Sequence, residues 1–418
     1  MAYNKDSFLA GLAVGRSLWK PPVKSAEMVD YFAFTIVLNE ETGKDYYVYV
    51  SSPRVSNVVI WGDGVVSSSY GSQDASHTYD DYGTYQVKIR GNGITRIGLT
   101  NTGPKAKAVV SIDTPLPPLV FSIEENFKGL VNLEHITPLL FYKCAPRLRS
   151  VKSGFSGCTR LTDISRHLFR GCSALTDLSG CFYDCPNIKE IPQGLFKDCS
   201  AATTFDSCFA LTSYDQSAIP TVLPDYLFQD CHDAVSFRRC FFYRKLASIP
   251  EHTFSGCVSA EDFYSVFYWS GNTITEIPVG LFADTISAKN FDYVFYRFGI
   301  TDIPDDLFSH CPDADSFAST FAYTGITSIP SNLFASCPNV DSFNGTFQEC
   351  RSLQSIPSNL FTNCPNVTSF SYAFDDGRAI TGAVPALWVS HPNANGTRCF
   401  RYCYSASNYN DIPIAWKS

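Results

Sequence analysis

The sequence predicts a mainly β protein with short helical or 3-10 turns, in which a solenoid of 26–28-residue repeats follows a small β-sandwich domain. Two observations carry this prediction. First, a phenylalanine recurs at nearly constant intervals through the last two thirds of the chain. Second, residues 31–113 contain strand-like runs separated by polar turns. With 45% hydrophobic and 17% charged residues, the 418-residue chain has the composition of a folded protein.

The repeat is marked by the second residue of a Leu-Phe pair or its equivalent. Nine copies follow one another at intervals of 28, 27, 32, 26, 28, 26, 26 and 27 residues, and the longest interval holds an insertion around SYDQSAIPTVLP. The marker residues are Phe141, Phe169, Phe196, Phe228, Phe254, Phe282, Phe308, Phe334 and Phe361. One such unit cannot bury its own apolar face, so the units are expected to stack around a shared core.

The working consensus is L-x-S-I-P-x-x-L-F-x-x-C-P-x-x-x-S-F-x-x-x-F. The alternation in L-x-S-I suits a short strand with Leu and Ile pointing inward, and the proline after it stops the strand. L-F-x-x-C spaces apolar groups as one helical or 3-10 turn would. S-F begins a second extended piece. We expect L-x-S-I to form the main strand of a concave face, with the second piece as the alternative.

This pattern, with Phe-x-x-Cys and sequences such as I-T-S-I-P at residues 326–330, resembles the BspA-like leucine-rich repeats of bacterial surface proteins. The resemblance covers roughly residues 120–415. It implies a leucine-rich-repeat solenoid that serves recognition or adhesion without catalysis. The repeat region itself is predicted to span residues 114–378, and the altered rhythm of residues 379–418, which include Trp416, predicts a C-terminal cap over the last apolar face.

The cysteines follow the repeat. Fifteen of the sixteen lie between residues 144 and 399, and most end a Phe-x-x-Cys or begin a Cys-Phe. Because cysteine is small and readily buried, a ladder of free core thiols is the preferred interpretation, with disulfides or a metal site as alternatives. The sequence has no Cys-x-x-Cys, and its seven histidines are scattered, which disfavours zinc.

Residues 31–113 follow a different pattern. FAFTIVL, YYVYVSS, NVVIWGDG and TYQVKIRG are predicted strands. VVIWGDG followed by HTYDDYGTYQVKIRGNG resembles the signature of PKD-like β-sandwiches. The matching residues are Trp61, Gly62, Asp63, Gly64, His77, Tyr79, Gly83, Tyr85 and Val87. Asp63 and His77 are interpreted as turn and packing residues rather than a catalytic pair.

Residues 1–30 are predicted to be a docking segment. FLAGLAVG resembles the apolar core of a signal peptide, but Asp6 precedes it, Arg16 closes it, and no small-x-small cleavage site follows. A short amphipathic helix ended by Pro21-Pro22 is preferred. The segment also resembles those of gut-phage and prophage structural proteins.

Several function classes are disfavoured. A net charge of −8 argues against general nucleic-acid binding, and no apolar run is long enough to span a membrane. No catalytic, phosphate-binding or dinucleotide motif is present, so we predict no enzyme, cofactor or metal. The one candidate for glycan hydrolysis is a carboxylate pair on adjacent repeats, Glu276 and Asp302. Asp375-Asp376 is interpreted as a turn and helix start.

The predicted binding site is a stripe of aromatic residues just after the second phenylalanine of successive repeats. The segments are Phe242-Tyr243-Arg244, Tyr268-Trp269, Tyr296-Arg297-Phe298 and Ala322-Tyr323, and the candidate residues are Tyr243, Tyr268, Trp269, Tyr296 and Tyr323. Tyr, Trp and Arg dominate binding hot spots. We expect the five to be substantially exposed on one edge. The alternative is that they fold back against the solenoid.

The functional prediction is a non-catalytic recognition or adhesion protein that acts outside the cell. We favour a phage virion surface or tail-associated receptor-binding protein that contacts a bacterial or mucosal surface. Its partners would be a protein or glycan on that surface and, through residues 1–30, a virion or cell-surface scaffold. The alternatives are an exported BspA-like adhesin of the bacterial cell surface and a glycan-active enzyme on a repeat scaffold.

Overall fold

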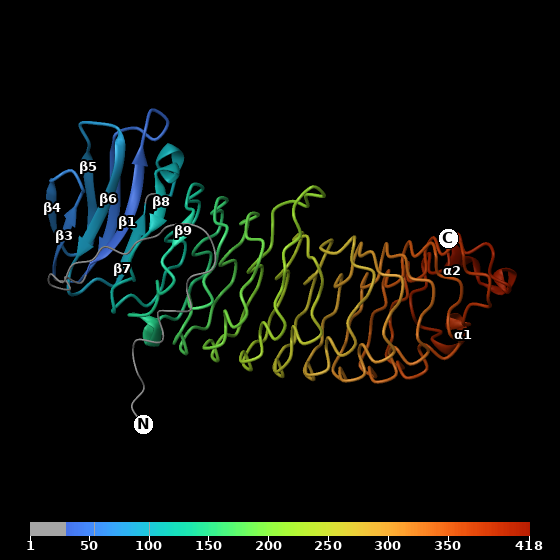
Figure 1. The fold of residues 1–418 in the computed structure, drawn as a ribbon. Helices are drawn as coiled ribbons and strands as arrows, with labels where there is room; N and C mark the ends of the chain where they lie inside the picture. Colours follow the sequence, from blue (N-terminus) through green and yellow to red (C-terminus); the bar gives the residue numbers. More distant parts are fainter. Residues whose placement is uncertain (1–30, 54, 100) are drawn as a thin grey trace, which may run out of the picture. The chain divides into compact units, whose positions relative to one another are not determined.

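The computed structural model describes residues 31–53, 55–99 and 101–418, and the predicted docking segment lies outside them. The first part contains two sheets (Figure 1): a six-stranded sheet of order β4-β3-β6-β1-β8-β9 and a three-stranded sheet of order β5-β2-β7. The strands are β1 (Phe32–Leu38), β2 (Asp45–Ser51), β3 (Ser56–Ile60), β4 (Val66–Tyr70), β5 (Gln73–Thr78), β6 (Gly83–Arg90), β7 (Arg96–Leu99), β8 (Val109–Ile112) and β9 (His135–Ile136). All pairings are antiparallel except β8 with β9.

The four strands predicted from sequence correspond to β1, β2, β3 and β6. In β2, Tyr46, Val48 and Val50 are buried while Tyr47 and Tyr49 are exposed, as the alternation of a strand with one solvated face requires. The sequence does not predict β4, β5, β7 or β8. β4 (VSSSY) and β5 (QDASHT) consist mostly of polar residues, so they lack a strong apolar alternation.

The turn that begins at Trp61 explains the WGDG motif. Asp63 Oδ1 accepts a hydrogen bond from the Val65 N–H at 3.0 Å, and its Oδ2 lies 2.5 Å from His77 Nε2. Gly62 has a φ of 92°, and a Cβ there would come within 2.8 Å of the Gln86 carbonyl oxygen. His77 in turn stacks on the buried Trp61. The predicted turn and packing roles of Asp63 and His77 are therefore confirmed, while the PKD-like relationship stays a prediction.

The first repeat is bonded to both sheets. The parallel pairing of β8 with β9 joins the six-stranded sheet to the repeat region, and the Leu99 N–H of β7 donates to the Asn126 carbonyl at 3.3 Å. The short 3-10 helix η2 (Gly103–Lys107) connects β7 to β8. Buried residues of the sheets and of the repeats belong to one hydrophobic cluster, so the apolar core continues across the junction.

From residue 122 onward the chain winds into successive coils, which lie side by side in chain order (Figure 1). Parallel bridges connect one residue of each coil to the equivalent residue of the next. These residues are Ser122, Ser150, Asp177, Thr204, Ser236, Asp262, Asn290, Ser316, Ser342, Ser369 and Asn395. Their spacing reproduces the intervals read from the sequence. The coils therefore stack in register, with one sequence repeat per coil.

The continuous bridge ladder runs through the S-F piece, so the prediction that L-x-S-I forms the main strand is wrong. Around L-x-S-I the only bridges in the described coils, Glu190 to Val222 and Thr221 to Leu246, lie next to the insertion. Elsewhere this piece makes a single bond between coils, such as Thr327 N–H to the Thr301 carbonyl at 3.0 Å. The proline that follows has no N–H, so it cannot extend the pairing.

Three ladders of stacked phenylalanine rings fill the core. The first consists of the nine marker residues, with ring centroids 5.5–6.2 Å apart. The second, which follows S-F by four residues, consists of Phe127, Phe155, Phe182, Phe209, Phe241, Phe267, Phe295, Phe321, Phe347, Phe374 and Phe400. The third is the S-F residue itself, from Phe205 to Phe370. All are buried, which explains why the chain uses 33 phenylalanines.

All sixteen cysteines are free and buried, which confirms the prediction of a core ladder. Several thiols reach the preceding coil: Cys158 Sγ donates to the Phe127 carbonyl and Cys350 Sγ to the Phe321 carbonyl, both at 3.2 Å. Burial raises the pKa of Cys350 to about 12. The protonated thiol is therefore the stable form. It packs in the core and donates a weak hydrogen bond to a backbone carbonyl of the preceding coil. The Leu and Phe of the L-F pairs are buried as predicted.

In one coil an arginine, Arg244, occupies the position that Cys158 and Cys350 hold in theirs. Its side chain is 1% exposed. The guanidinium donates to the carbonyls of Phe209, Ile188 and Cys185 and to Thr221 Oγ1. Burial lowers the pKa of Arg244 to about 10, so it stays charged at neutral pH. The insertion supplies Thr221, and Arg244 thus bonds the enlarged coil to its neighbours.

The C-terminal residues cover the end of the core. They include α1 (Leu387–Ser390), η4 (Tyr409–Asp411) and α2 (Ile414–Lys417), while η3 (Ala145–Arg147) lies in an early coil. Trp416 stacks on Phe400 with centroids 6.3 Å apart and is nearly buried. Gly396 takes the position that Phe370 holds in the preceding coil, and a Cβ there would come within 2.0 Å of the Trp416 ring. The Trp416 indole thus occupies the space that a phenylalanine ring of the third ladder would fill in this coil.

Candidate binding surface

Each coil presents two residues directly after its second-ladder phenylalanine. From the coil of Phe241 to that of Phe374 these pairs are Phe242-Tyr243, Tyr268-Trp269, Tyr296-Arg297, Ala322-Tyr323, Gln348-Glu349 and Asp375-Asp376. The second member of each pair has a positive φ of 51–63°. Its N–H donates to the carbonyl of the first member in the next coil, for example Trp269 to Tyr296 at 3.0 Å. The left-handed backbone is therefore a repeated structural feature that holds these side chains in register.

The five predicted residues do come together. Tyr268 and Tyr296 stack almost in parallel, with centroids 4.6 Å apart and planes at 3°. Tyr243 lies edge-on to Trp269 at 5.9 Å, and Tyr296 lies 5.2 Å from Tyr323. We call this surface the aromatic face. It consists of Tyr214, Phe242, Tyr243, Tyr268, Trp269, Tyr296, Arg297 and Tyr323.

The five residues are less exposed than predicted: each is half-buried rather than substantially exposed. Each ring covers part of its neighbour in the next coil, so stacking removes one side of the ring from water. Burial raises the pKa of Tyr268 to about 12, with a further contribution from the nearby Tyr296. Three residues of the predicted segments do not belong to the face at all: Arg244, Phe298 and Ala322 are buried.

Arg297 replaces an aromatic ring in the stack. Its guanidinium carbon lies 4.8 Å from the ring centre of Trp269 and 4.6 Å from that of Tyr323. A planar cation between two rings contributes about 0.5–1 kcal/mol per contact at a partly exposed site. The two rings hold the guanidinium in one orientation at the surface.

Sequence reasoning missed Tyr214, which comes from the insertion. Its ring stacks on Trp269 with centroids 5.6 Å apart, and its hydroxyl bonds Asn272 Oδ1 at 2.5 Å. Two tyrosines from the S-F piece, Tyr264 and Tyr293, also flank the face, since Tyr293 lies 5.7 Å from Tyr296. The insertion lies outside the repeat, so periodicity gave no signal for Tyr214. The other two occupy a position that varies between repeats.

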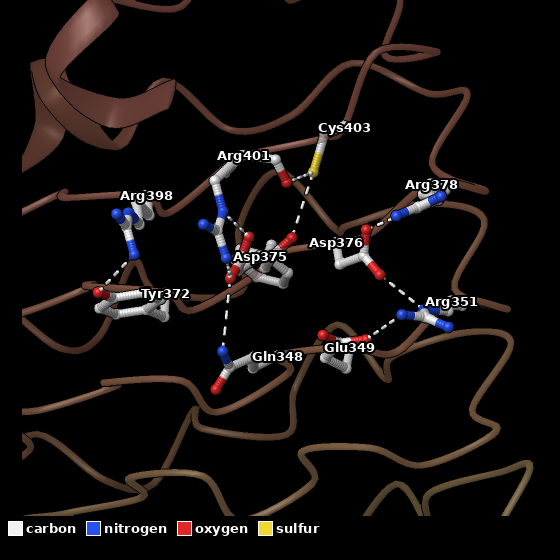
Figure 2. A network of polar contacts seen from close by, with 11 residues as sticks. Gln348, Glu349, Arg351, Tyr372, Asp375, Asp376, Arg378, Arg398, Arg401 and Cys403 are labelled. Carbon is white, nitrogen blue, oxygen red and sulfur yellow. Dashed lines mark hydrogen bonds and ion pairs between the residues drawn. The ribbon is translucent and has the colours of Figure 1, made fainter. Parts of the chain in front are cut away.

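The same coil positions become ionic towards the C-terminus, as Figure 2 shows. Asp375 is fully buried and accepts two bonds from Arg401, at 2.7 and 2.6 Å. Asp376 is 2% exposed and bonds Arg351 at 2.6 Å and Arg378 at 2.5 Å. Asp375 and Asp376 lie in a turn, as interpreted, but they do not start a helix. They are the buried half of an ion-pair network between the last coils.

The carboxylates of this network influence each other. Although burial raises the pKa of Asp376, the bonds from Arg378 and Arg351 bring it below its ordinary value. Burial and the neighbouring Asp376 raise the pKa of Glu349, which Arg351 contacts at 2.6 Å. Arg351 and Arg378 are mostly exposed, whereas the Asp376 carboxylate that they share is buried beneath them.

Comparison with known protein families assigns the repeats. The family model described as "BspA type leucine rich repeat region" matches residues 123–219, 178–266, 201–292 and 267–376, which together span more than half of the chain. The chain belongs to the BspA-type leucine-rich repeat family. In this protein, BspA-type repeats thus stack through a ladder of parallel β-bridges and ladders of phenylalanine rings. Such repeat scaffolds typically serve recognition, and no catalytic family matches.

Two further comparisons add little to the BspA-type assignment. No curated protein matches the chain. Among solved structures, a crystal structure of a TLR13–ssRNA13 complex aligns with 12% identity and a TM-score of 0.28, over 64% of this chain and 45% of that one. A likeness at this TM-score supports no argument about function.

The candidate catalytic residues Glu276 and Asp302 are both exposed, and Asp302 accepts a hydrogen bond from the hydroxyl of its neighbour Thr301. Within residues 31–418, apart from positions 54 and 100, no group of three or more metal-ligating side chains is assembled. No helix among these residues has the length and apolar character needed to cross a membrane.

Proposed function

We propose that this protein is a non-catalytic recognition protein that binds a protein or glycan on a cell surface through the aromatic face. The observation that carries the proposal is the continuous stack from Tyr243 to Tyr323, with Arg297 held between Trp269 and Tyr323. Partly exposed Tyr, Trp and Arg in fixed positions offer large contact area with little ordering cost on binding. The repeats supply the rigid support.

The finer proposal places the protein on a phage virion, as a surface or tail-associated receptor-binding protein, with residues 31–113 as a PKD-like β-sandwich and residues 1–30 as the docking segment. The free buried thiols support this version over an exported adhesin. A virion protein folds in the reducing cytoplasm and leaves by lysis, whereas an exported chain with sixteen cysteines would meet an oxidising compartment. The exported adhesin of the bacterial surface is the second candidate, favoured by its repeat family.

The aromatic face is tested by measuring attachment of fluorescently labelled protein to bacterial cells and to mucin-coated surfaces. Trp269→Ala removes the ring that contacts Tyr214, Tyr243 and Arg297. Hot-spot truncations typically cost at least about 2 kcal/mol, so attachment should weaken at least about tenfold. Tyr142→Ala, which truncates an exposed tyrosine of an early coil, is the matched control and should bind normally.

Because Trp269 is half-buried, Trp269→Phe is measured as well, since it retains the stacking and should bind within about threefold of the wild type. Normal attachment by folded Trp269→Ala would refute the aromatic face as the binding site. For the location, an antibody against residues 31–418 is applied to purified phage particles and to intact cells of the source strain. Labelling of cells alone would reject the virion version and keep the exported one.

A further inference from the structure

A cavity of about 350 Å³ lies where the three-stranded sheet meets the first coil. It is separate from the aromatic face, and the inference drawn from it does not depend on the proposed function. Tyr47 and Tyr49 of β2 line it with Arg96 and Gly98 of β7, and the first coil contributes Glu125 and Asn126. The volume is at the lower end of the range for small-ligand sites, enough for one ring-sized group.

The sheet side of this cavity is an open aromatic platform. Tyr47 and Tyr49 are alternate residues of β2, so both rings stand on its outward face, about 7 Å apart along the strand. Gly98 pairs directly with Tyr49 across the sheet. A Cβ at Gly98 would lie 3.5–3.9 Å from Tyr49, so any side chain there would rest against the Tyr49 ring. The glycine leaves that ring uncovered, whereas Lys105 lies over Tyr47.

The other side of the cavity is polar and held in place. Asn126 is 3% exposed, and its Oδ1 accepts a bond from Arg96 Nε at 3.1 Å. Its buried Nδ2 has no hydrogen-bond partner among the described residues, an unusual state for a buried donor. The Glu125 carboxylate, paired with Lys128 at 2.6 Å, supplies acceptors. Donors and acceptors thus face an aromatic surface across a small space.

We propose that this cavity binds a single pyranose ring of a saccharide, stacked on Tyr49 and bonded by Arg96, Glu125 and Asn126. A pyranose has an apolar C–H face that packs on an aromatic ring. Its vicinal hydroxyls each donate and accept, which matches a site offering guanidinium and amide donors beside a carboxylate. A purely apolar ligand would leave these polar groups unpaired.

The test is saturation-transfer NMR of the full-length protein with the methyl glycosides of glucose, galactose, mannose, fucose, N-acetylglucosamine and N-acetylgalactosamine. This experiment detects the weak binding that one ring on an open site gives. At least one glycoside should receive saturation from the wild type. Tyr49→Ala, which removes the platform, and Gly98→Val, which covers it, should each reduce the effect at least fivefold. Valine is favoured in strands, and Gly98 does not need a positive φ, so Gly98→Val should fold.

Tyr70→Ala truncates an exposed tyrosine of β4 in the other sheet and serves as the matched control, with unchanged saturation expected. Circular dichroism checks that each variant is folded. The proposal is overturned if no glycoside is saturated, or if folded Tyr49→Ala and Gly98→Val both retain the effect. Loss of saturation in Trp269→Ala but not in Tyr49→Ala would also overturn it, because the saccharide would then bind the aromatic face.

Discussion

Replacing Arg401 by methionine should open the C-terminal end of the repeat stack. The Asp375 carboxylate is fully buried, and its two short bonds come from Arg401; a third, at 3.4 Å, comes from Gln348. The hydrogen bonds with Asp375 raise the pKa of Arg401, so the guanidinium stays charged under all ordinary conditions. Removing the guanidinium leaves a buried carboxylate with one weak neutral donor. Breaking a buried pair in this way costs about 3–5 kcal/mol.

The cost should be local, because a coil interacts only with its neighbours. Hydrogen exchange followed by mass spectrometry measures it. Amides between the last two coils, such as Phe374 N–H to the Cys399 carbonyl at 2.9 Å, should exchange more than about 100-fold faster, while coils before residue 316 keep their protection. The double variant Arg401→Met with Asp375→Leu removes both charges and should recover most of the protection.

Arg378→Met is the matched control. Arg378 bonds Asp376 in the same network, but its side chain is 63% exposed and Asp376 keeps Arg351. A surface arginine of this kind contributes about 0–1 kcal/mol. If Arg401→Met exchanges no faster than Arg378→Met, or if the double variant is as open as the single one, the buried pair does not hold the end of the stack.

Three further predictions concern the core and the network. Arg244→Met should lower the free energy of unfolding by at least about 2 kcal/mol, because the buried carbonyl oxygens that accept from the guanidinium lose their donors. Urea denaturation measures this, and an unchanged unfolding midpoint would contradict it. All sixteen thiols should be inert to a thiol reagent in the native protein and should react in guanidinium chloride, whereas mass-spectrometric detection of mostly bridged cysteines would refute the free ladder. The folded-state pKa of Asp376 lies below its ordinary 3.8, so its contribution to stability is complete above about pH 4 and is lost as the pH falls through the folded value. In Arg378→Met this acid-induced loss should begin at a higher pH, and identical acid profiles would show that Arg378 does not lower that pKa.

The sequence by itself determined the period, the number of marker repeats and the inward-facing residues. Each coil must bury the same side chains against its neighbours, so the phenylalanine and cysteine positions recur with the coil length and can be read directly. The position of the aromatic stripe followed from the same periodicity. Strand β1 and the WGDG turn were also predictable, because their signals are local alternation and turn-forming residues.

Only the tertiary structure decided which extended piece carries the bridge ladder, how far the aromatic rings are covered, and what the exceptional residues do. Arg244, Tyr214 and Asp375 each depend on a partner in another coil: the guanidinium on carbonyls up to 59 residues away, the Tyr214 ring on Trp269, and the carboxylate on Arg401. The cavity beside Tyr49 likewise combines two strands with the first coil. A repeat pattern records what every coil shares, whereas burial, ion pairing and cavities arise between unlike residues of neighbouring coils, and these contacts have no fixed spacing along the chain.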